Sequence, residues 1–445
     1  MTGPETIRAA EIVEEVARRL ADPVEVSRVA STNTDRLLDG RQPLVWHAMS
    51  LNEGFLGVAL LHSELGRREH AHAFLAAAAG AQARKHALID GLPALLFATR
   101  AAAAQPGDYA SLLGRAESIV RKIARQRAEA ELSRLEPGRA GVAFSAYDVI
   151  EGLTGLGRVV LSYGDTEPLS YLIALTEPIE VAGTPVPGWL VSHAPLSGAP
   201  AGDGHFNLGL AHGIPGPLAL LAVAYRRGFR LPGHEQAMER VAGWLLDWGD
   251  GGLWPPTVTL RQQLDRAGVR THGHAEPETP DRTVPTAYSR TLPAASHFRP
   301  AWCYGTPGVA RALFLAGQAL DRPEWRQAAV RALHETLARP WDEWGMVDAG
   351  LCHGWAGMLH VTCRVGRESG DRALLAAADA LAGRIVAEFA EDAPFGFRYS
   401  GTGGIEVAPD RVGLLEGAAG IALALHHYCG GEPPATGWDA ALLLN

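Results

Sequence analysis

The segment Leu351-Cys352-His353-Gly354-Trp355-Ala356-Gly357 contains the pattern that decides the fold: a glycine, two residues, a second small residue and then an apolar run. This pattern occurs seven times, and six copies keep both glycines, while the second copy has Ala94 in place of its second glycine. Repetition of one local pattern indicates a repeat architecture, because each copy then folds as the same supersecondary unit. The first glycines of the copies are Gly54, Gly91, Gly152, Gly213, Gly305, Gly354 and Gly417.

The distances between these glycines fit helical hairpins. Successive first glycines are 37, 61, 61, 92, 49 and 63 residues apart, and each interval has room for one helix, a turn and a second helix that returns. The runs that follow the glycines, such as residues 217–224, are apolar on nearly all faces, which predicts helices buried on every side. The segments between them, such as 322–339 and 367–388, are amphipathic and charged, and they predict outer helices.

Seven buried helices, each with an amphipathic partner, predict an all-α fold. We expect an α/α toroid in which outer helices surround seven inner helices, formed as one domain by residues 1–445, with all glycine patterns at one rim. An open solenoid of the same hairpins is the alternative. Because an open solenoid leaves one face of its inner helices in water, and these helices are too apolar for that, the closed ring is favoured.

Two segments depart from the repeat. Residues 160–205 contain short β-prone runs at 171–175 and 179–186 among turn residues, so we expect a small β-containing insertion there. Residues 254–300 are rich in Pro, Thr, His and Arg and have no helical period. This segment explains the longest interval, and we expect a long irregular loop near the active-site rim.

Composition and charge exclude several classes of protein. The chain has 445 residues, of which 47% are hydrophobic and 20% charged, as is typical of a globular protein. The net charge of −9 and the lack of a basic stripe argue against nucleic acid as a partner. No apolar run is long enough to span a bilayer, and the first residues lack the pattern of a signal peptide. With only four cysteines, we expect a cytoplasmic, reduced protein whose thiols can bind a metal.

Three residues near the predicted rim form a candidate metal site. Cys303 and Cys352 each lie two residues before the first glycine of their repeat, and His353 lies one residue before Gly354. Equivalent positions of successive hairpins should point to the same mouth, so two thiols and one imidazole are expected to converge. Three protein ligands with an open fourth position are typical of a catalytic zinc site. The sequence therefore predicts one Zn²⁺ ion held by these residues, where it would activate a substrate thiol.

For several other residues the sequence alone allows both a functional and a purely structural role. His212 directly precedes Gly213, and this rim position favours a functional role over a buried core histidine or a helix cap. Asp148 suits a cap of the third inner helix equally well, and Arg299 suits an ordinary loop charge. Cys363 and Cys429 are best explained as small buried hydrophobic residues. Acidic residues that occupy the position of His212 in other repeats complement helix N-termini, namely Glu53, Asp90, Glu151 and Glu416.

Taken together, these patterns resemble the lanthionine cyclase (LanC) family, the class I lanthipeptide cyclases. The similarity covers nearly the whole chain and includes residues 50–57, 147–155, 211–213, 301–305, 351–354, 414–420 and 438–444. The resemblance implies an α/α toroid and an SH2-like extension that residues 160–205 would match in part. It also implies zinc bound by Cys303, Cys352 and His353, with roles near the metal for five further residues: Asp148, His212, Arg299, Trp302 and Tyr304. Thr306 stands where many relatives have Asp, which bears on the choice of substrate.

The reaction implied by this resemblance is a Michael-type addition. A peptide cysteine would attack dehydroalanine or dehydrobutyrine and form a (methyl)lanthionine ring of a lantibiotic. His212 would donate the proton or act as the base, Arg299 would hold the developing enolate, and Asp148 would orient one of these two. The implied partners are a dehydrated precursor peptide, with a leader and a Ser/Thr/Cys-rich core, and a dehydratase and transporter in a complex at the bacterial membrane.

Two other classes of function compete with this hypothesis. A LanC-like protein that binds glutathione or other thiols, or serves as a scaffold, would use the same Cys₂His set without cyclase activity. A composition rich in Ala, Arg and Gly is typical of a high-GC bacterium and favours peptide maturation. A zinc prenyltransferase subunit uses Asp, Cys and His around an aromatic cavity, and a toroidal glycosidase needs paired carboxylates. Two cysteines with one histidine, and only 7% aromatic residues, do not fit the prenyltransferase. For the glycosidase the candidate acids are Glu53, Asp90, Glu151 and Glu416, but their positions at helix ends explain them without catalysis.

Overall fold

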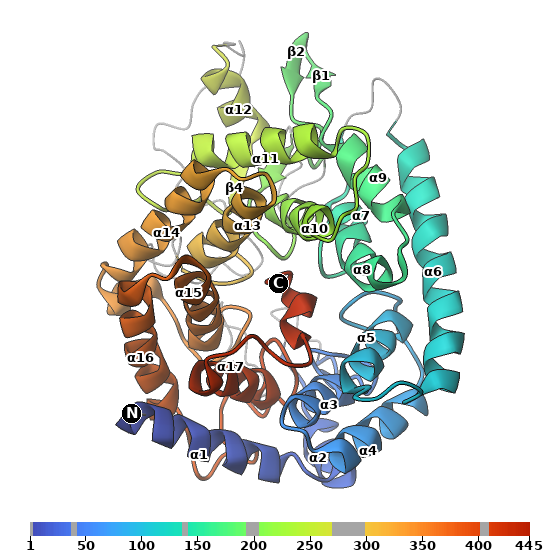
Figure 1. The fold of residues 1–445 in the computed structure, drawn as a ribbon, viewed down its shortest axis with the longest axis vertical. Coiled ribbons are helices and arrows are strands. Elements are labelled where there is room, and N and C mark those ends of the chain that lie inside the picture. Colours follow the sequence, from blue (N-terminus) through green and yellow to red (C-terminus); the bar gives the residue numbers. More distant parts are fainter. Residues whose placement is uncertain (1–2, 37–41, 136–140, 193–203, 269–298, 401–408) are drawn as a thin grey trace.

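The inner layer of the fold is a ring of helices that begin at the glycine patterns (Figure 1). The computed structural model describes residues 3–36, 42–135, 141–192, 204–268, 299–400 and 409–445. Within these residues α17 packs against α3, so the ring is closed and the predicted toroid is confirmed. The inner helices are α3 (Phe55–Glu64), α5 (Leu92–Ala102), α8 (Leu153–Val160), α10 (Pro215–Arg226), α13 (Thr306–Ala319), α15 (Trp355–Ser369) and α17 (Ala418–Gly430).

An outer layer of amphipathic helices surrounds this ring. The last inner helix, α17, receives its outer partner from the opposite end of the chain, because α1 packs against both α17 and α16. The short α2 (Pro23–Ala30) continues this layer and packs against α4. The outer helices are α1 (Pro4–Arg19), α4 (Arg68–Ala79), α6 (Ala110–Ser133), α9 (Glu167–Leu175), α11 (His234–Trp248), α14 (Pro323–Leu337) and α16 (Arg372–Ala387). None of the helices in the described part of the chain is long and apolar enough to cross a membrane.

The second glycine of the pattern is required by close backbone contact. In each such repeat the loop before the helix folds back, so that a carbonyl oxygen lies against the glycine six residues later. A Cβ atom on Gly357 would lie 2.1 Å from the oxygen of Leu351, and one on Gly420 would lie 1.7 Å from the oxygen of Leu414. These glycines therefore allow the rim loops to pack directly on the helix starts.

A segment after α17 fills the centre of the ring (Figure 1). It contains the 3₁₀ turn η4 (Trp438–Leu442), whose residues are all buried. Arg311 of α13 donates from Nε to the carbonyl of Leu444 at 2.9 Å and forms an ion pair with Glu368 of α15. The central segment is thereby tied to two neighbouring inner helices.

The two irregular segments differ in part from their predictions. The run 171–175 is helical, not β, because it belongs to α9, which packs against α6 and α8 as an outer helix. The expected β-structure is present as one short antiparallel hairpin, formed by β1 (Ile179–Val181) and β2 (Thr184–Val186). In the described part of 160–205 the strands are this hairpin and the start of one further short strand, β3 (His205–Asn207), so a larger SH2-like extension is not seen there. Residues 193–203 lie outside the described residues.

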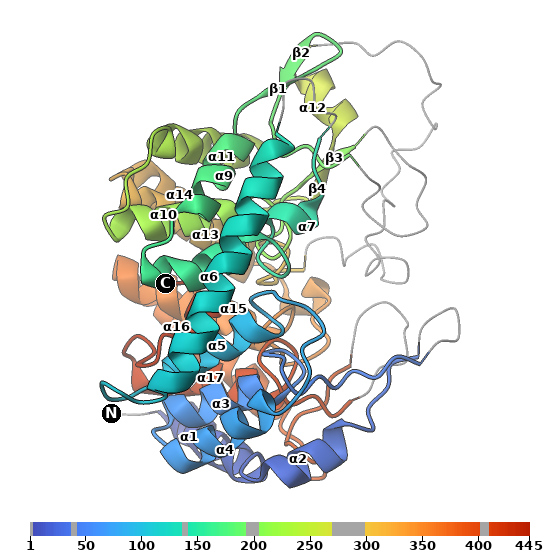
Figure 2. The same ribbon diagram turned by 90° about the vertical axis from the view of Figure 1, so that its right-hand side faces the viewer.

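Part of the segment 254–300 is also regular, so the expectation of a wholly irregular loop is wrong. Strand β4 (Thr257–Thr259) pairs with β3 (His205–Asn207), and α12 (Leu260–Arg266) follows it directly. A capping box of Thr259 and Gln262 starts this helix, because each side chain bonds to the backbone N–H of the other residue. The hairpin β1–β2 and α12 project together from one side of the ring (Figure 2). The rest of the predicted loop, 269–298, lies outside the described residues.

Candidate metal centre

Backbone hydrogen bonds join the rim loops of successive repeats. The N–H of Cys303 donates to the carbonyl of Cys352 at 3.1 Å, and the N–H of Cys352 donates to that of Leu415 at 2.8 Å. Equivalent positions of neighbouring repeats are therefore adjacent, and this is why two cysteines 49 residues apart in the sequence meet. Similar backbone bonds, some of them one residue earlier in the loop, join other described repeats: Val149 to Ala211, Ala211 to Cys303, Leu414 to Leu51 and Leu51 to Ile89.

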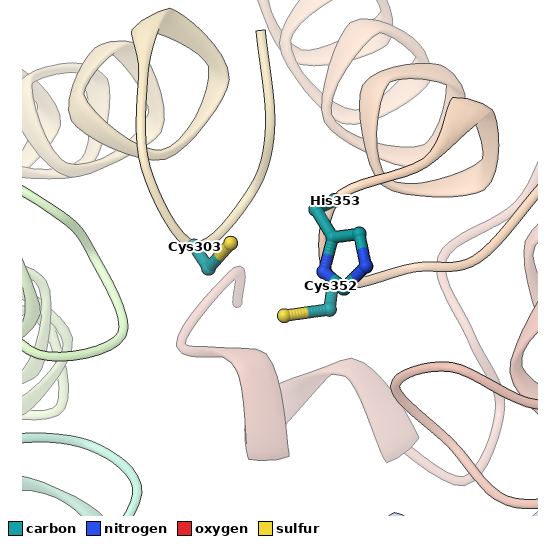
Figure 3. A group of neighbouring side chains, drawn as sticks. All are labelled: Cys303, Cys352 and His353. Atoms are coloured by element: carbon teal, nitrogen blue, oxygen red, sulfur yellow. The ribbon is translucent and has the colours of Figure 1, made fainter. Parts of the chain in front are cut away.

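The side chains of Cys303, Cys352 and His353 point toward one another at this rim (Figure 3). One ligand atom of each lies within 4.8 Å of those of the other two, as the sequence predicts. Nε2 of His353 is turned to the hydroxyl of Tyr399 at 3.3 Å and to a carboxylate oxygen of Asp348 at 3.8 Å. The Nδ1 atom therefore faces the two sulfurs (Figure 3).

The thiols and the imidazole of this cluster are coupled electrostatically. A hydrogen bond from the Cys352 thiol, together with the nearby His353, holds the pKa of Cys303 well below its usual range. The same hydrogen bond and burial raise the pKa of Cys352 well above its usual value. Burial opposes protonation of His353, but its hydrogen bond to Cys303 and the charge of Asp348 outweigh this and raise its pKa to about 9. Two thiol sulfurs and one imidazole are a donor set that suits zinc, which binds the deprotonated forms.

His212 and Asp148 form a hydrogen-bonded pair at the same rim. Nδ1 of His212 donates to Oδ2 of Asp148 at 2.7 Å. The other carboxylate oxygen accepts from the N–H groups of Glu151 at 2.8 Å and Gly152 at 2.6 Å, so Asp148 also holds the loop that leads into α8. Burial opposes protonation of His212, but the Asp148 carboxylate outweighs it and raises the pKa of His212 above its usual value. One side chain thus contacts both His212 and the loop before α8, whereas the expected side-chain cap of α8 itself is not present.

Tyr304 and Trp302 flank Cys303 but point to different surroundings. The hydroxyl of Tyr304 accepts a hydrogen bond from the side chain of Asn207 at 2.9 Å, and its ring centroid lies 6.3 Å from that of His212. The indole of Trp302 is fully buried and donates to the carbonyl of Leu442 in the central segment at 3.0 Å. Tyr304 therefore lies toward His212, whereas Trp302 connects the Cys303 loop to the central segment.

Arg299 brings a cation to the cluster. Its Nε and Nη2 atoms are buried and have no hydrogen-bond partner among the described residues. Burial lowers the pKa of Arg299, and the charges of Cys303 and Asp348 act in the opposite direction. Two buried donors beside the sulfurs suit the binding of an anion.

Sequence reasoning missed several residues that shape this site. Asn207 and Asp348 each lie six residues before the first glycine of their repeat, as does Arg299. The side chains of Asn207 and Asp348 accept hydrogen bonds from the backbone two residues later, at 2.9 and 2.8 Å, and so set the shape of their rim loops. A search of that position for polar residues would have found both. Tyr399 lies between two repeats, where the pattern carries no signal.

Comparisons with known proteins agree with the fold and with these patterns. The family model described as lanthionine synthetase C-like protein matches residues 45–443. The nisin biosynthesis protein NisC of Lactococcus lactis subsp. lactis is 24% identical over 229 residues, and the alignment spans 48% of each chain, about half the length of that relative. A solved structure of nisin cyclase is similar over 98% of both chains with a TM-score of 0.69 and 18% identity, which supports the fold alone. This chain therefore belongs to the lanthionine synthetase C-like family.

Proposed function

We propose that this protein is a zinc-dependent lanthipeptide cyclase, which adds peptide cysteine thiols to dehydroalanine or dehydrobutyrine residues. The observation that carries the proposal is the convergence of Cys303, Cys352 and His353 at the rim of a toroid of this family. Their substrate would be a dehydrated precursor peptide with a leader and a Ser/Thr/Cys-rich core. We further propose that residues 1–445 act as one domain, in the bacterial cytoplasm, with a dehydratase and a transporter as partners at the membrane.

One Zn²⁺ bound by the three ligands would supply the positive charge that favours the thiolate form of an incoming peptide cysteine. Cys303, Cys352 and His353 lie in the rim loops that precede α13 and α15, so the peptide cysteine would have to approach the rim of the ring. Trp302 is a positioning residue in this proposal, because its bond to Leu442 holds the loop that carries Cys303.

His212 is the proposed proton donor. The peptide thiol first loses its proton to solvent. The thiolate then forms a carbon–sulfur bond at the β-carbon while the π electrons move into an enolate, and protonation of the α-carbon completes the addition. Because Nδ1 of His212 is bonded to Asp148, the proton for the α-carbon would leave from Nε2. The raised pKa of His212 keeps this group protonated to a higher pH, which suits a general acid. Asp148 orients the ring.

Arg299 and Tyr304 are proposed to act on the enolate. The buried donors of Arg299 have no partner among the described residues, and the charges of Cys303 and Cys352 act on this guanidinium, so we propose that it receives the enolate oxygen. Fixed donors aimed at developing charge stabilise a transition state more than a ground state. Tyr304, held by Asn207, adds a hydroxyl on the side of His212.

The substitution Cys303→Ala tests this proposal. The variant should lose most bound zinc and most ring closure on a dehydrated peptide, measured by metal analysis and by thiol alkylation with mass spectrometry. Cys363→Ala is the matched control, because Cys363 is a buried cysteine of α15 outside the metal cluster. Full zinc content with normal ring closure in Cys303→Ala would remove the proposal.

The competing function is the binding of glutathione or another thiol without cyclisation. The same Cys₂His ligands would serve thiol binding. The two functions can therefore be distinguished only by whether a cyclised peptide is formed. The wild-type protein is therefore incubated with a dehydrated peptide and, separately, with glutathione. A protein that binds glutathione at its metal but leaves every peptide thiol open to alkylation is not a cyclase.

A further inference from the structure

We propose that Tyr399 and Arg411 are positioning residues of the metal centre, which hold the imidazole of His353 with Nδ1 directed at the two cysteine sulfurs. This inference rests on the proposed metal site and extends it beyond the three ligands. It is carried by a chain of contacts that starts at His353 and ends on the N-terminal part of the protein.

The first contact of this chain is made by the ligand itself. When Nδ1 of His353 faces a metal, Nε2 carries the remaining proton, and the hydroxyl oxygen of Tyr399 lies 3.3 Å from it. The carboxylate oxygen of Asp348 is farther, at 3.8 Å, which is too long for a hydrogen bond. A metal-bound histidine commonly donates its second N–H to such an outer partner, which fixes the orientation of the ring. Tyr399 is therefore the nearer orienting group.

The second contact fixes Tyr399. Its side chain is buried, with 7% of the residue exposed, and its backbone N–H donates to the carbonyl of Pro409 at 2.7 Å. The backbone N–H of Arg411 donates to the same carbonyl at 3.2 Å. The guanidinium carbon of Arg411 lies 4.9 Å from the centroid of the Tyr399 ring, a cation–π arrangement. The phenol is thereby held between its own backbone and a buried cation.

The third contact fixes Arg411. Only 4% of its side chain is exposed, and Nη2 reaches both carboxylate oxygens of Asp35 at 2.8 Å. Nη1 donates to Glu53 at 3.1 Å. Burial opposes the charge of Arg411, but the acids around it, led by Glu416, raise its pKa above the usual value. A guanidinium shared between two carboxylates has little freedom, because its donors have a fixed planar geometry.

These contacts connect parts of the ring that are far apart in the sequence. His353 belongs to the sixth repeat, Arg411 precedes the seventh, Glu53 belongs to the first, and Asp35 lies before all of them. Asn33 adds a further link by donating from its side chain to the carbonyl of Asp410 at 2.6 Å. A buried ion pair contributes little net stability compared with apolar packing, so stability alone does not explain this chain of contacts. A role in supporting a metal ligand does explain this chain of contacts.

The test compares conservative variants of the full-length protein. Tyr399→Phe removes only the hydroxyl, and Arg411→Lys keeps the charge but cannot reproduce the shared geometry. Tyr171→Phe is the control for the first, because Tyr171 is a fully buried tyrosine of the outer helix α9. Arg121→Lys is the control for the second, because Arg121 forms a two-point ion pair with Asp165 on the outer wall.

Two measurements separate positioning from general stability. Zinc affinity is measured by competition with a chelating dye, and Co²⁺ is added to the metal-free protein so that its absorption spectrum reports the ligand geometry. Tyr399→Phe should weaken zinc binding by about 10-fold to 100-fold, the usual effect of losing an outer partner, and should shift the Co²⁺ bands. Arg411→Lys should also weaken zinc binding and shift the Co²⁺ bands, but by less than Tyr399→Phe. The two controls should match the wild type in both.

The outcomes distinguish this inference from the proposed function. If the wild-type protein binds neither Zn²⁺ nor Co²⁺, the metal centre itself is wrong, and the positioning role is lost with it. If the wild type binds metal and Tyr399→Phe equals Tyr171→Phe in affinity and spectrum, the positioning role alone is refuted. It is also refuted if affinity merely follows the melting temperature across all four variants.

Discussion

Replacing Asp148 by asparagine separates the two roles that this side chain combines. One carboxylate oxygen accepts from two backbone N–H groups at the start of α8, and the other accepts from Nδ1 of His212. In Asp148→Asn the amide oxygen can keep both backbone bonds, because an amide nitrogen there would face two donors. The –NH₂ group must then face Nδ1 of His212. Since that group only donates, Nδ1 has to become an acceptor, which disfavours the protonated ring.

The size of the effect follows from the lost hydrogen bond. A bond to a charged group contributes about 1.5–3 kcal/mol, and about 1.4 kcal/mol corresponds to a tenfold change. His212 is 32% exposed at its side chain, so water weakens the interaction and the lower half of this range applies. The wrong tautomer adds to the loss, because general acid catalysis by one side chain contributes about 10²-fold to 10⁴-fold. We therefore expect kcat to fall about 10²-fold near neutral pH while zinc binding is retained.

The assay is single-turnover ring closure on a dehydrated peptide, followed by thiol alkylation, with zinc content measured on the same samples. The matched control is Asp371→Asn, because Asp371 likewise accepts from two backbone N–H groups and bonds a histidine, His334, outside the candidate site. The pH profile gives a second readout. Since Asp148 raises the pKa of His212, removing the carboxylate should move the alkaline fall in activity to lower pH. An unchanged rate, or a loss no larger than that of Asp371→Asn, would refute the role of this pair.

Three further outcomes are expected. His212→Asn should keep its zinc and lose ring closure by about 10²-fold or more; loss of the metal instead would make His212 a ligand. Gly420→Ala should lower the melting temperature, with an overpacking cost of about 1–3 kcal/mol or more, because its Cβ would meet the Leu414 carbonyl, whereas Gly430→Ala in the same helix, with open space around it, should not. Burial and the charge of Asp348 raise the pKa of Glu388 to about 7 in the folded protein. The folded protein therefore loses stability as the pH rises from the ordinary pKa of a glutamate to above 7, because the buried carboxyl must ionise. Glu388→Gln should thus raise the melting temperature more at about pH 8 than at about pH 5; an equal effect at both would contradict the raised pKa.

The repeat architecture could be predicted because one local requirement recurs. A loop that folds back on a helix start leaves no room for a side chain, so the glycines mark every inner helix. The role of α1 could not be predicted, because its contact with α17 joins opposite ends of the chain. The run 171–175 was wrongly expected to be β, since a short apolar run does not distinguish a strand from a buried helix. The capping box at Thr259 and Gln262, by contrast, was a readable helix signal.

The site was predictable to the extent that it follows the repeat. Cys303 and Cys352 occupy one repeat position, and backbone bonds between loops convert that equivalence into proximity. Asp148 could not be assigned, because a helix cap and a partner of His212 use the same residue type. The contact of Arg411 with Asp35 joins residues 376 positions apart, and no local pattern reports a pairing of this kind.

The candidate metal ligands come from two repeats, which ties the candidate chemistry to the packing of neighbouring hairpins. Cys303 lies before α13, whereas Cys352 and His353 lie before α15, so neither hairpin alone contains the set. The rim bonds then pass from Cys352 to the seventh repeat, and from the seventh repeat to Leu51 in the first. The loop that carries Cys352 and His353 is therefore held between its neighbours in the fifth and seventh repeats. Metal affinity should consequently depend on contacts far from the sulfurs, since those contacts keep the two loops side by side.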